Sequence, residues 1–511
     1  MSLVTVEVIA AIDAAGATRT FYLSTEAFTT GATDAPASTS FDASLLDPGS
    51  VGVSLFGDGR TGGASRISLG EIRIANADGR YDGWLDYGFD GRRVVIRAGV
   101  AGAAYPSAFQ PVFTGTVETL TVSRAEVVIR LRDNQLLFSL PVLTEVYGGT
   151  NVLPNGVDGT ANDLAGKRKP RLYGRAFNIP APVVNTSKLI YQVSDGPIAS
   201  IDGVYDRGGA LTAGTDHADN GGLQGATVSA GTYQTCLAEG LFRLGSSPAG
   251  EVTADATQGA AAVDRTAASI LSTLALAAGV PSGDVSASDV VALAADVPAP
   301  LGIWISGDGE TYAKVMDAVA ASVGGFYTFD PSGVFRVGRL AEPAGTPVLD
   351  LYEYDIAEPF ERRPARDGDV PAKGFTIRHS RVFRVQAGDI AGSVTDARRA
   401  LIANEYRAQR AANESTALKY LLAAEESADT LLTTQSDASN EASRRLALHG
   451  VKRDFFDLNI DASLLTASGA KLSDTVRLTS TRFGLSSGRL FRLLGTRTDR
   501  ARNRATLTIW G

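Results

Sequence analysis

Three oxygen-bearing side chains near the start of the chain, Asn76, Asp78 and Asp82, have the chemistry of a calcium-binding loop, with Gly79 between them. The full ligand spacing and the terminal bidentate glutamate of such a loop are absent. Asp-Gly pairs are also common in turns for backbone reasons. We therefore interpret the segment as a turn, and we predict no metal-binding residues.

A second group of polar residues surrounds His217, which is flanked by Asp216, Asp219 and Asn220. It too lacks the spacing of a metal site. His217 could serve as the base for a nucleophilic Cys236. A free cysteine more often packs as a small apolar residue, so the structural interpretation is favoured and no catalytic residue is predicted here.

Two acidic residues, Asp308 and Glu310, precede a predicted helix. Acidic side chains near a helix N-terminus interact favourably with the helix dipole, which accounts for both. A carboxylate pair that cleaves glycosides would need a cleft with aromatic platforms, and the sequence locates none. No phosphate-binding glycine loop is present. The sequence therefore predicts no enzymatic activity and no cofactor-binding residues.

The strongest basic cluster is the run Lys167–Arg171, in a chain whose net charge is −8. Because neutralisation of phosphates supplies most non-specific affinity for nucleic acid, so acidic a chain is not expected to hold DNA. We interpret the run as a solvated loop or a protein–protein contact. The overall acidity would suit a conduit through which DNA slides without sticking.

Cys236 is the only cysteine, and the three histidines, His217, His379 and His449, lie far apart in the sequence. Disulfides within the chain are therefore excluded, and a zinc site is not expected. No apolar run approaches the length of a membrane span. The first residues are typical of a strand and not of a signal peptide, which predicts synthesis in a cytoplasm.

The hydrophobic patterns divide the 511 residues into four units. Residues 1–145 alternate between apolar and polar, with turn signals between short runs, and predict a β-barrel. Residues 146–249 predict an extended β connecting region rich in glycine, proline and aromatic residues. Residues 250–345 predict a small α+β domain with two helices and a hairpin. Residues 346–511 predict a second β-barrel with an Ala-rich helical insert at about 395–450.

The two helices expected in residues 250–345 have recognisable ends. Asp264 is the expected N-cap of the first helix, and Gly279 ends it. The second helix has an apolar face that includes Val315 and Val319, and it ends at Gly324. A hairpin is predicted directly after it.

The end of the chain echoes a segment near its start at an offset of 380 positions. Gly115-Thr116 recurs as Gly495-Thr496, and Arg124-Ala125 recurs as Arg504-Ala505. Alternating strand patterns accompany both copies. These matches favour two β-barrel domains related by internal duplication, so the expected fold class is mainly β with an α+β insertion.

The chain resembles the central tail-hub proteins of long-tailed, non-contractile bacteriophages. The likeness is carried by turn and packing signatures: Tyr147-Gly-Gly-Thr-Asn, Leu153-Pro-Asn-Gly-Val-Asp-Gly159, Leu164 to Gly174, Val204-Tyr-Asp-Arg-Gly208, Asp90-Gly-Arg-Arg93, Gly324 to Gly333, and Phe483-Gly-Leu-Ser with the closing Trp510-Gly511. It touches most of the chain and includes no catalytic motif.

The resemblance implies a homotrimer at the virion tail tip. Two alike β-barrels in each of three subunits would present six barrels to a sixfold tail tube and its distal tail protein ring. Implied partners are the tape measure protein and a central fibre or receptor-binding protein, with DNA only in transit through the lumen. Gating of the exit of tape measure and DNA on receptor engagement is part of the same expectation. Some hub relatives bind an iron–sulfur cluster through several cysteines, which Cys236 alone cannot provide.

Two other functions stay open at this point. The first is a tail-associated cell-wall hydrolase, which would need a deep cleft with convergent carboxylates. The second is a carbohydrate-binding adhesin, which would present exposed aromatic residues of the central segment on one face. A hub predicts instead that these aromatic residues are buried or lie in interfaces.

Overall fold

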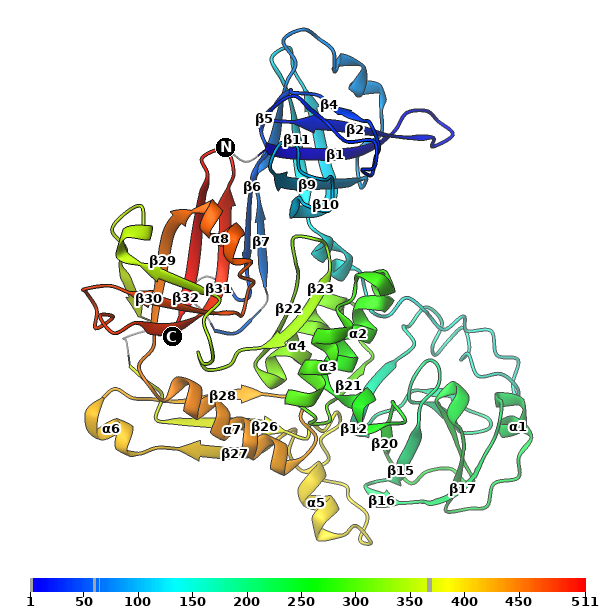
Figure 1. Ribbon diagram of the computed structural model, residues 1–511. Coiled ribbons are helices and arrows are strands. Elements are labelled where there is room, and N and C mark those ends of the chain that lie inside the picture. Colours follow the sequence, from blue (N-terminus) through cyan, green and yellow to red (C-terminus); the bar gives the residue numbers. More distant parts are fainter. Residues whose placement is uncertain (1–2, 58–60, 64, 365–369) are drawn as a thin grey trace.

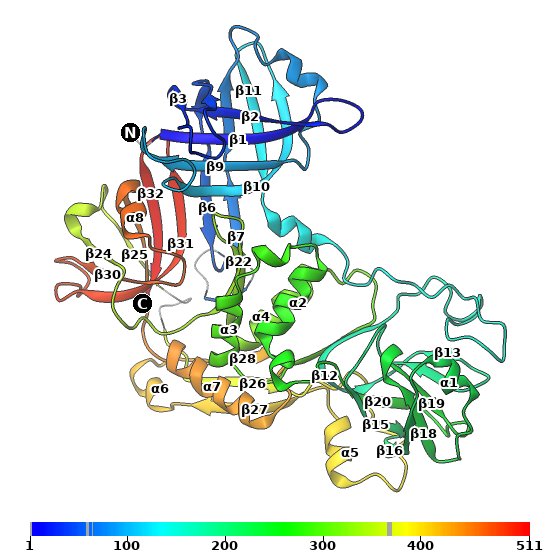
Figure 2. The ribbon, with the colours of Figure 1, turned by 45° about the vertical axis from the view of Figure 1, so that its right-hand side comes forward.

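The computed structural model describes residues 3–57, 61–63, 65–364 and 370–511. The fold is mainly β, with helices gathered at the centre and along one arm (Figure 1). The N-terminal, middle and C-terminal sheets surround the central helices. A view turned by 45° shows the N-terminal sheet above the helices and well away from the middle sheets (Figure 2).

The N-terminal unit is an antiparallel sheet in the order β2-β1-β9-β10-β11-β8-β5. Apolar residues at alternate positions, such as Val6, Ile96 and Ile129, point into a single core. Its strands are β1 (Leu3–Ala11), β2 (Thr18–Ser24), β5 (Leu45–Asp47), β8 (Glu71–Ala75), β9 (Arg93–Gly99), β10 (Gln110–Val122) and β11 (Glu126–Arg132). A separate short hairpin pairs β3 (Phe28–Thr29) with β4 (Ser40–Phe41).

One hairpin leaves the N-terminal unit and joins the C-terminal sheet (Figure 1). It consists of β6 (Ser50–Ser54) and β7 (Arg66–Leu69). β6 pairs antiparallel with the second half of β31 (Arg489–Asp499), where Val53 lies opposite Thr496. The two ends of the chain are therefore joined by backbone hydrogen bonds within one sheet.

The middle unit consists of two five-stranded sheets, ordered β16-β15-β20-β12-β21 and β13-β14-β19-β18-β17. Both contribute to one core, in which the stacked rings of Tyr191 and Phe242 have centroids 4.9 Å apart. The segment predicted as a connecting region is thus most of a packed β unit with its own core. Its elements are β12 (Arg171–Ile179), β13 (Val183–Asn185), β14 (Ile190–Gln192), β15 (Ser200–Asp206), β16 (Gly209–Ala210), β17 (Thr212–Asp216), α1 (Asn220–Gly225), β18 (Thr232–Cys236), β19 (Leu241–Leu244), β20 (Val252–Thr257) and β21 (Gly302–Ile305).

The central helices are α2 (Ala267–Ala277), α3 (Ala287–Asp296) and α4 (Tyr312–Val323), followed by the hairpin β22 (Gly325–Phe329) and β23 (Phe335–Arg339). α4 ends as predicted at Gly324, which adopts the left-handed conformation. Asp264 is not the cap of α2. It lies in a preceding 3₁₀ turn, and the hydroxyl of Thr266 caps the helix instead. α3 was not anticipated.

The C-terminal sheet has the order β24-β30-β31-β32-β29-β25, with β6 also paired to β31. Trp510, Phe456 and Phe491 are fully buried in its two adjoining cores. Its elements are β24 (Leu349–Tyr352), β25 (Arg362–Pro364), β29 (Asp454–Asp461), α8 (Ala462–Ser468), β30 (Thr475–Thr479), β31 and β32 (Arg504–Trp510).

The proposed internal duplication is not confirmed at the level of residues. The strand order β9-β10-β11-β8 does recur as β30-β31-β32-β29. However, the hairpin turn closes at Val122 and Val127 in the first sheet and at Asp499 and Arg504 in the second, an offset of 377 and not 380. β1 is antiparallel to β9, whereas β24 is parallel to β30. The sheets share an order of strands, and the matched residue pairs occupy different positions in them.

The Ala-rich stretch predicted as a helical insert is only partly helical. Its helices are α5 (Asp396–Ile402), α6 (Ser415–Lys419) and α7 (Gln435–His449). Between them, β27 (Arg407–Ala412) and β28 (Glu425–Asp429) flank β26 (Gly374–His379) in a three-stranded sheet, on which α7 packs. Alanine, arginine and glutamate favour helices locally, and strand pairing with β26 overrides that preference.

Candidate functional site

The Asn76 cluster is a hydrogen-bonded turn. The Asn76 side chain is buried, and its amide nitrogen donates to Asp82 at 2.8 Å and to the carbonyl of Ser123 at 2.9 Å. Asp78 pairs with Arg80 at 2.7 Å. The oxygens that would ligate calcium are thus engaged within the protein. Across the described residues, no group of three or more His, Cys, Asp or Glu side chains could hold a metal ion.

Cys236 and His217 lie in the same part of the middle unit but have different surroundings. Cys236 is fully buried among apolar residues, and burial raises the pKa of its thiol. His217 is hydrogen-bonded to Gln234 at 2.8 Å. Asp219 caps α1, and Asp216 accepts a hydrogen bond from Thr235 at 2.8 Å. Asn220 donates to Glu239. Each of these polar side chains thus has a hydrogen-bond partner within the middle unit.

The acidic pair near α4 and the basic run Lys167–Arg171 are connected. Arg168 forms an ion pair with Asp308 at 3.3 Å, and Lys169 pairs with Asp158 at 3.1 Å. Glu310 pairs with Lys314 on the first turn of α4 at 2.7 Å. The basic run therefore binds acidic residues of its own chain, which leaves less of its charge for a nucleic acid.

The aromatic residues of the central segment do not form an exposed platform. Tyr147, Phe177 and Tyr191 are buried, and Tyr173 and Tyr205 are half-buried. The hydroxyl of Tyr147 donates to Gln192 at 2.6 Å. These residues therefore do not provide the exposed aromatic face that was expected of an adhesin. Among the described helices, none is long and apolar enough to cross a membrane.

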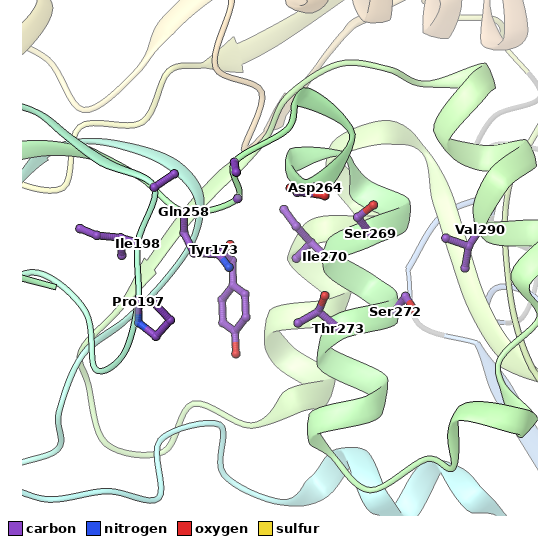
Figure 3. A pocket seen from close by; sticks show the side chains of 13 residues that line it. Tyr173, Pro197, Ile198, Gln258, Asp264, Ser269, Ile270, Ser272, Thr273 and Val290 are labelled. Atoms are coloured by element: carbon purple, nitrogen blue, oxygen red, sulfur yellow. The ribbon is translucent and has the colours of Figure 1, made fainter. Parts of the chain in front are cut away.

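A cleft of about 550 Å³ lies between the middle unit and α2 (Figure 3). One wall is formed by Pro197, Ile198 and the loop after β20, and the other by residues 269–273 of α2. Tyr173 on β12 projects between the two walls. Its volume lies within the range of small-molecule binding pockets, about 300 to 1,000 Å³.

Gly259 lines this cleft in the loop after β20. Its φ is 93°, a conformation that side chains rarely adopt, and a Cβ at this position would lie 2.8 Å from the Cβ of Asp264. The loop after β20 can therefore turn closely over the start of the helical unit only because residue 259 has no side chain.

The segment around α6 lies at one end of the three-stranded sheet (Figure 1) and has exposed apolar side chains. The side chains of Leu418, Leu421 and Leu422 are 84%, 88% and 84% exposed, and they occur within five residues at and just after α6. We call these three residues the leucine tip. Single exposed leucines are ordinary, whereas large exposed apolar patches are typical of interaction surfaces.

Neither the cleft nor the leucine tip was identified from the sequence. The cleft combines segments from β12, the loop before β15, the loop after β20 and α2, and no local pattern connects them. The leucine tip was visible in the sequence as three closely spaced leucines within the Ala-rich stretch. The stretch was interpreted as a helical insert, and the exposure of these three leucines was not predicted.

No family model and no curated protein matches the sequence. Solved structures with partial likeness include a tail protein from Neisseria meningitidis MC58, at 11% identity and a TM-score of 0.41, covering 93% of each chain. A 43 kDa tail protein of prophage MuSo2 from Shewanella oneidensis has 10% identity and a TM-score of 0.43, covering 100% of this chain and 96% of the other. A chain from the virion of a native gene transfer agent particle has 17% identity and a TM-score of 0.42, covering 68% and 85%. These neighbours are phage tail and virion proteins, at scores too low to establish a common fold or function.

Proposed function

We propose that this chain is a structural subunit of a phage tail or tail-like particle, and that it acts as a trimeric hub at the tail tip. The hub joins the sixfold tail tube and its distal ring to threefold tail-tip or receptor-binding proteins. The motif resemblance to tail-hub proteins supports this assignment. No catalytic step is part of the proposal.

The observation that carries the proposal is the leucine tip. Three leucine side chains more than four-fifths exposed are costly in water, since each gains about 2 kcal/mol when it is buried. The tip lies at the end of an arm, where it can contact a neighbour without rearrangement of the cores. An apolar surface of this kind is expected in a protein that works within an assembly.

The strand order supports the symmetry of the proposed hub. Each subunit carries two sheets that share the order of four strands, and β6 holds them together through its pairing with β31. Three subunits would thus present six similar sheets to a sixfold tube. In the proposed mechanism, receptor engagement moves these units apart so that tape measure and DNA can leave.

Immunogold labelling of intact particles tests the location. Antibodies raised against this chain are expected to label one end of the tail, at the tip. Gold particles along the length of the tail, or particles that lack the protein altogether, would contradict the proposal. Antibodies against the tail-tube protein provide the control, since they should label the whole tail.

A further inference from the structure

The cleft of Figure 3 is lined by polar groups without partners in the described chain. The hydroxyl of Tyr173, the carboxamide of Gln258 and the hydroxyl of Thr273 form no hydrogen bond there, although each belongs to the lining. None of the three is among the buried polar atoms that lack a partner, so each group is open to the cleft and accessible to a ligand.

The charge of the lining restricts the ligand. Asp264 is the only carboxylic acid among the lining residues, and no lysine, arginine or histidine is present. An anionic ligand would meet this carboxylate, and the neighbouring cation Arg171, whose charge acts to lower the pKa of Tyr173, is already paired with Asp195 at 3.8 Å. A cationic ligand would find one exposed carboxylate, which already accepts a hydrogen bond from the backbone of Ala261 at 2.9 Å. Neutral donors and acceptors dominate the site.

The apolar part of the lining completes the pattern. The ring of Tyr173 lies between Pro197 and Ile198 on one side and α2 on the other (Figure 3). An aromatic face beside several neutral hydrogen-bonding groups suits a ligand with both C–H faces and hydroxyl edges. A neutral sugar has this combination, and the cleft volume of about 550 Å³ accommodates one or two sugar units.

We infer that this cleft is a binding site for a neutral saccharide, with Tyr173, Gln258 and Thr273 as its hydrogen-bonding residues. The site is independent of the proposed hub role, since it lies within one subunit and requires no trimer. It also differs from an adhesin surface of exposed aromatic residues, because its single aromatic ring is half-buried between two units of the chain.

Saturation-transfer difference NMR with the full-length protein tests the inference. The probes are glucose, galactose, N-acetylglucosamine and lactose, with N-acetylneuraminic acid as the anionic comparison. At least one neutral probe is expected to bind more tightly than the anion. Absence of saturation transfer to every neutral probe, or tighter binding of the anion, would overturn the proposal.

Two variants locate the binding. Tyr173→Phe retains the ring and removes one hydroxyl, and Thr273→Val removes a hydroxyl at an exposed position of α2 that does not contribute to the core. Each is expected to weaken binding about fivefold to tenfold, the effect of one lost hydrogen bond. Tyr354→Phe is the matched control, because Tyr354 is exposed and distant in sequence from the cleft. Unchanged affinity in both cleft variants would refute the site, and Thr273→Val decides the matter if Tyr173→Phe fails to fold.

Discussion

The guanidinium carbon of Arg398 lies 3.5 Å from the centroid of the Tyr205 ring, which joins α5 to the middle unit across almost 200 positions of sequence. The same guanidinium pairs with the buried Asp255 at 2.7 Å and donates to Asn178 at 2.5 Å. Arg398 therefore fixes the segment that leads into the three-stranded sheet against the middle β unit.

Replacing Arg398 by alanine is expected to release this segment. The change leaves the carboxylate of Asp255 buried without its cation, which costs about 3 kcal/mol. Thermal unfolding would measure the loss of stability, and limited proteolysis of residues 381–405 would measure the release of the segment. Arg399→Ala is the matched control, since Arg399 is exposed on the same helix. This substitution should change neither the melting temperature nor the protease resistance. Equal protease resistance of the Arg398→Ala protein and the parent would contradict this role.

Glu441 provides a prediction on pH. Burial raises its pKa, but hydrogen bonds from Arg444 and the charges of Arg444, Arg445 and Arg339 outweigh that effect and lower the pKa to about 2. Because the folded-state pKa is below the ordinary value of 4.5, the ionised group stabilises the fold above about pH 4.5. This stabilisation is lost progressively as the pH falls towards 2.

Glu441→Gln is accordingly expected to cost about 3 kcal/mol of unfolding free energy at pH 7, and less as the pH falls from 4.5 towards 2. Urea titrations of both proteins at several pH values would show the difference narrowing. Glu414→Gln, at an exposed position, is the control. A difference that stays constant between pH 7 and pH 3 would count against the arginine cluster as its cause.

Because β6 pairs with β31, we predict that weakening β6 also lowers the protection of β31 against hydrogen exchange. Val53→Pro removes a backbone donor from a strand that pairs on both sides. Hydrogen exchange at residues 495–499 is expected to accelerate, while exchange in β15 of the middle unit stays unchanged and provides the internal control. Undiminished protection of residues 495–499 would show that β6 does not hold this part of β31.

If the leucine tip is an interface, changing it should weaken self-association and leave the stability of the fold unchanged. Leu418, Leu421 and Leu422 changed together to serine should leave the melting temperature within about 2 °C, since these side chains contact little of their own chain. Self-association should weaken at least about tenfold in sedimentation velocity. In the matched control, Leu46, Leu85 and Val100 are changed to serine, because they are exposed singly on the N-terminal unit. Equal association of both triple variants would argue against the tip as an interface.

The sequence predicted elements well where local pattern and tertiary context agree. α4 and its end illustrate this, because Val315 and Val319 face the core and Gly324 takes the left-handed conformation that a helix end favours. β27 shows the opposite case. Its sequence Arg407–Ala412 consists of helix-favouring residues, and only its pairing with β26 makes it a strand.

Contacts between segments that are distant in the sequence could not be predicted, and the reason is physical. The pairing of Val53 with Thr496 and the stacking of Arg398 on Tyr205 depend on how distant segments pack, and neither has a periodic signature. The cleft has the same origin, since Tyr173 and Thr273 meet across two units of the chain. The duplication inferred from Gly115 and Gly495 is not confirmed, because the strand registers do not align these short matches.

The mass of the purified protein in solution tests the central proposal most directly. Light scattering on a size-exclusion column should give three times the chain mass of 53.3 kDa, and the value should persist on dilution. A mass of 53.3 kDa at every concentration, in the presence as well as the absence of the tail-tube ring, would contradict the trimeric hub.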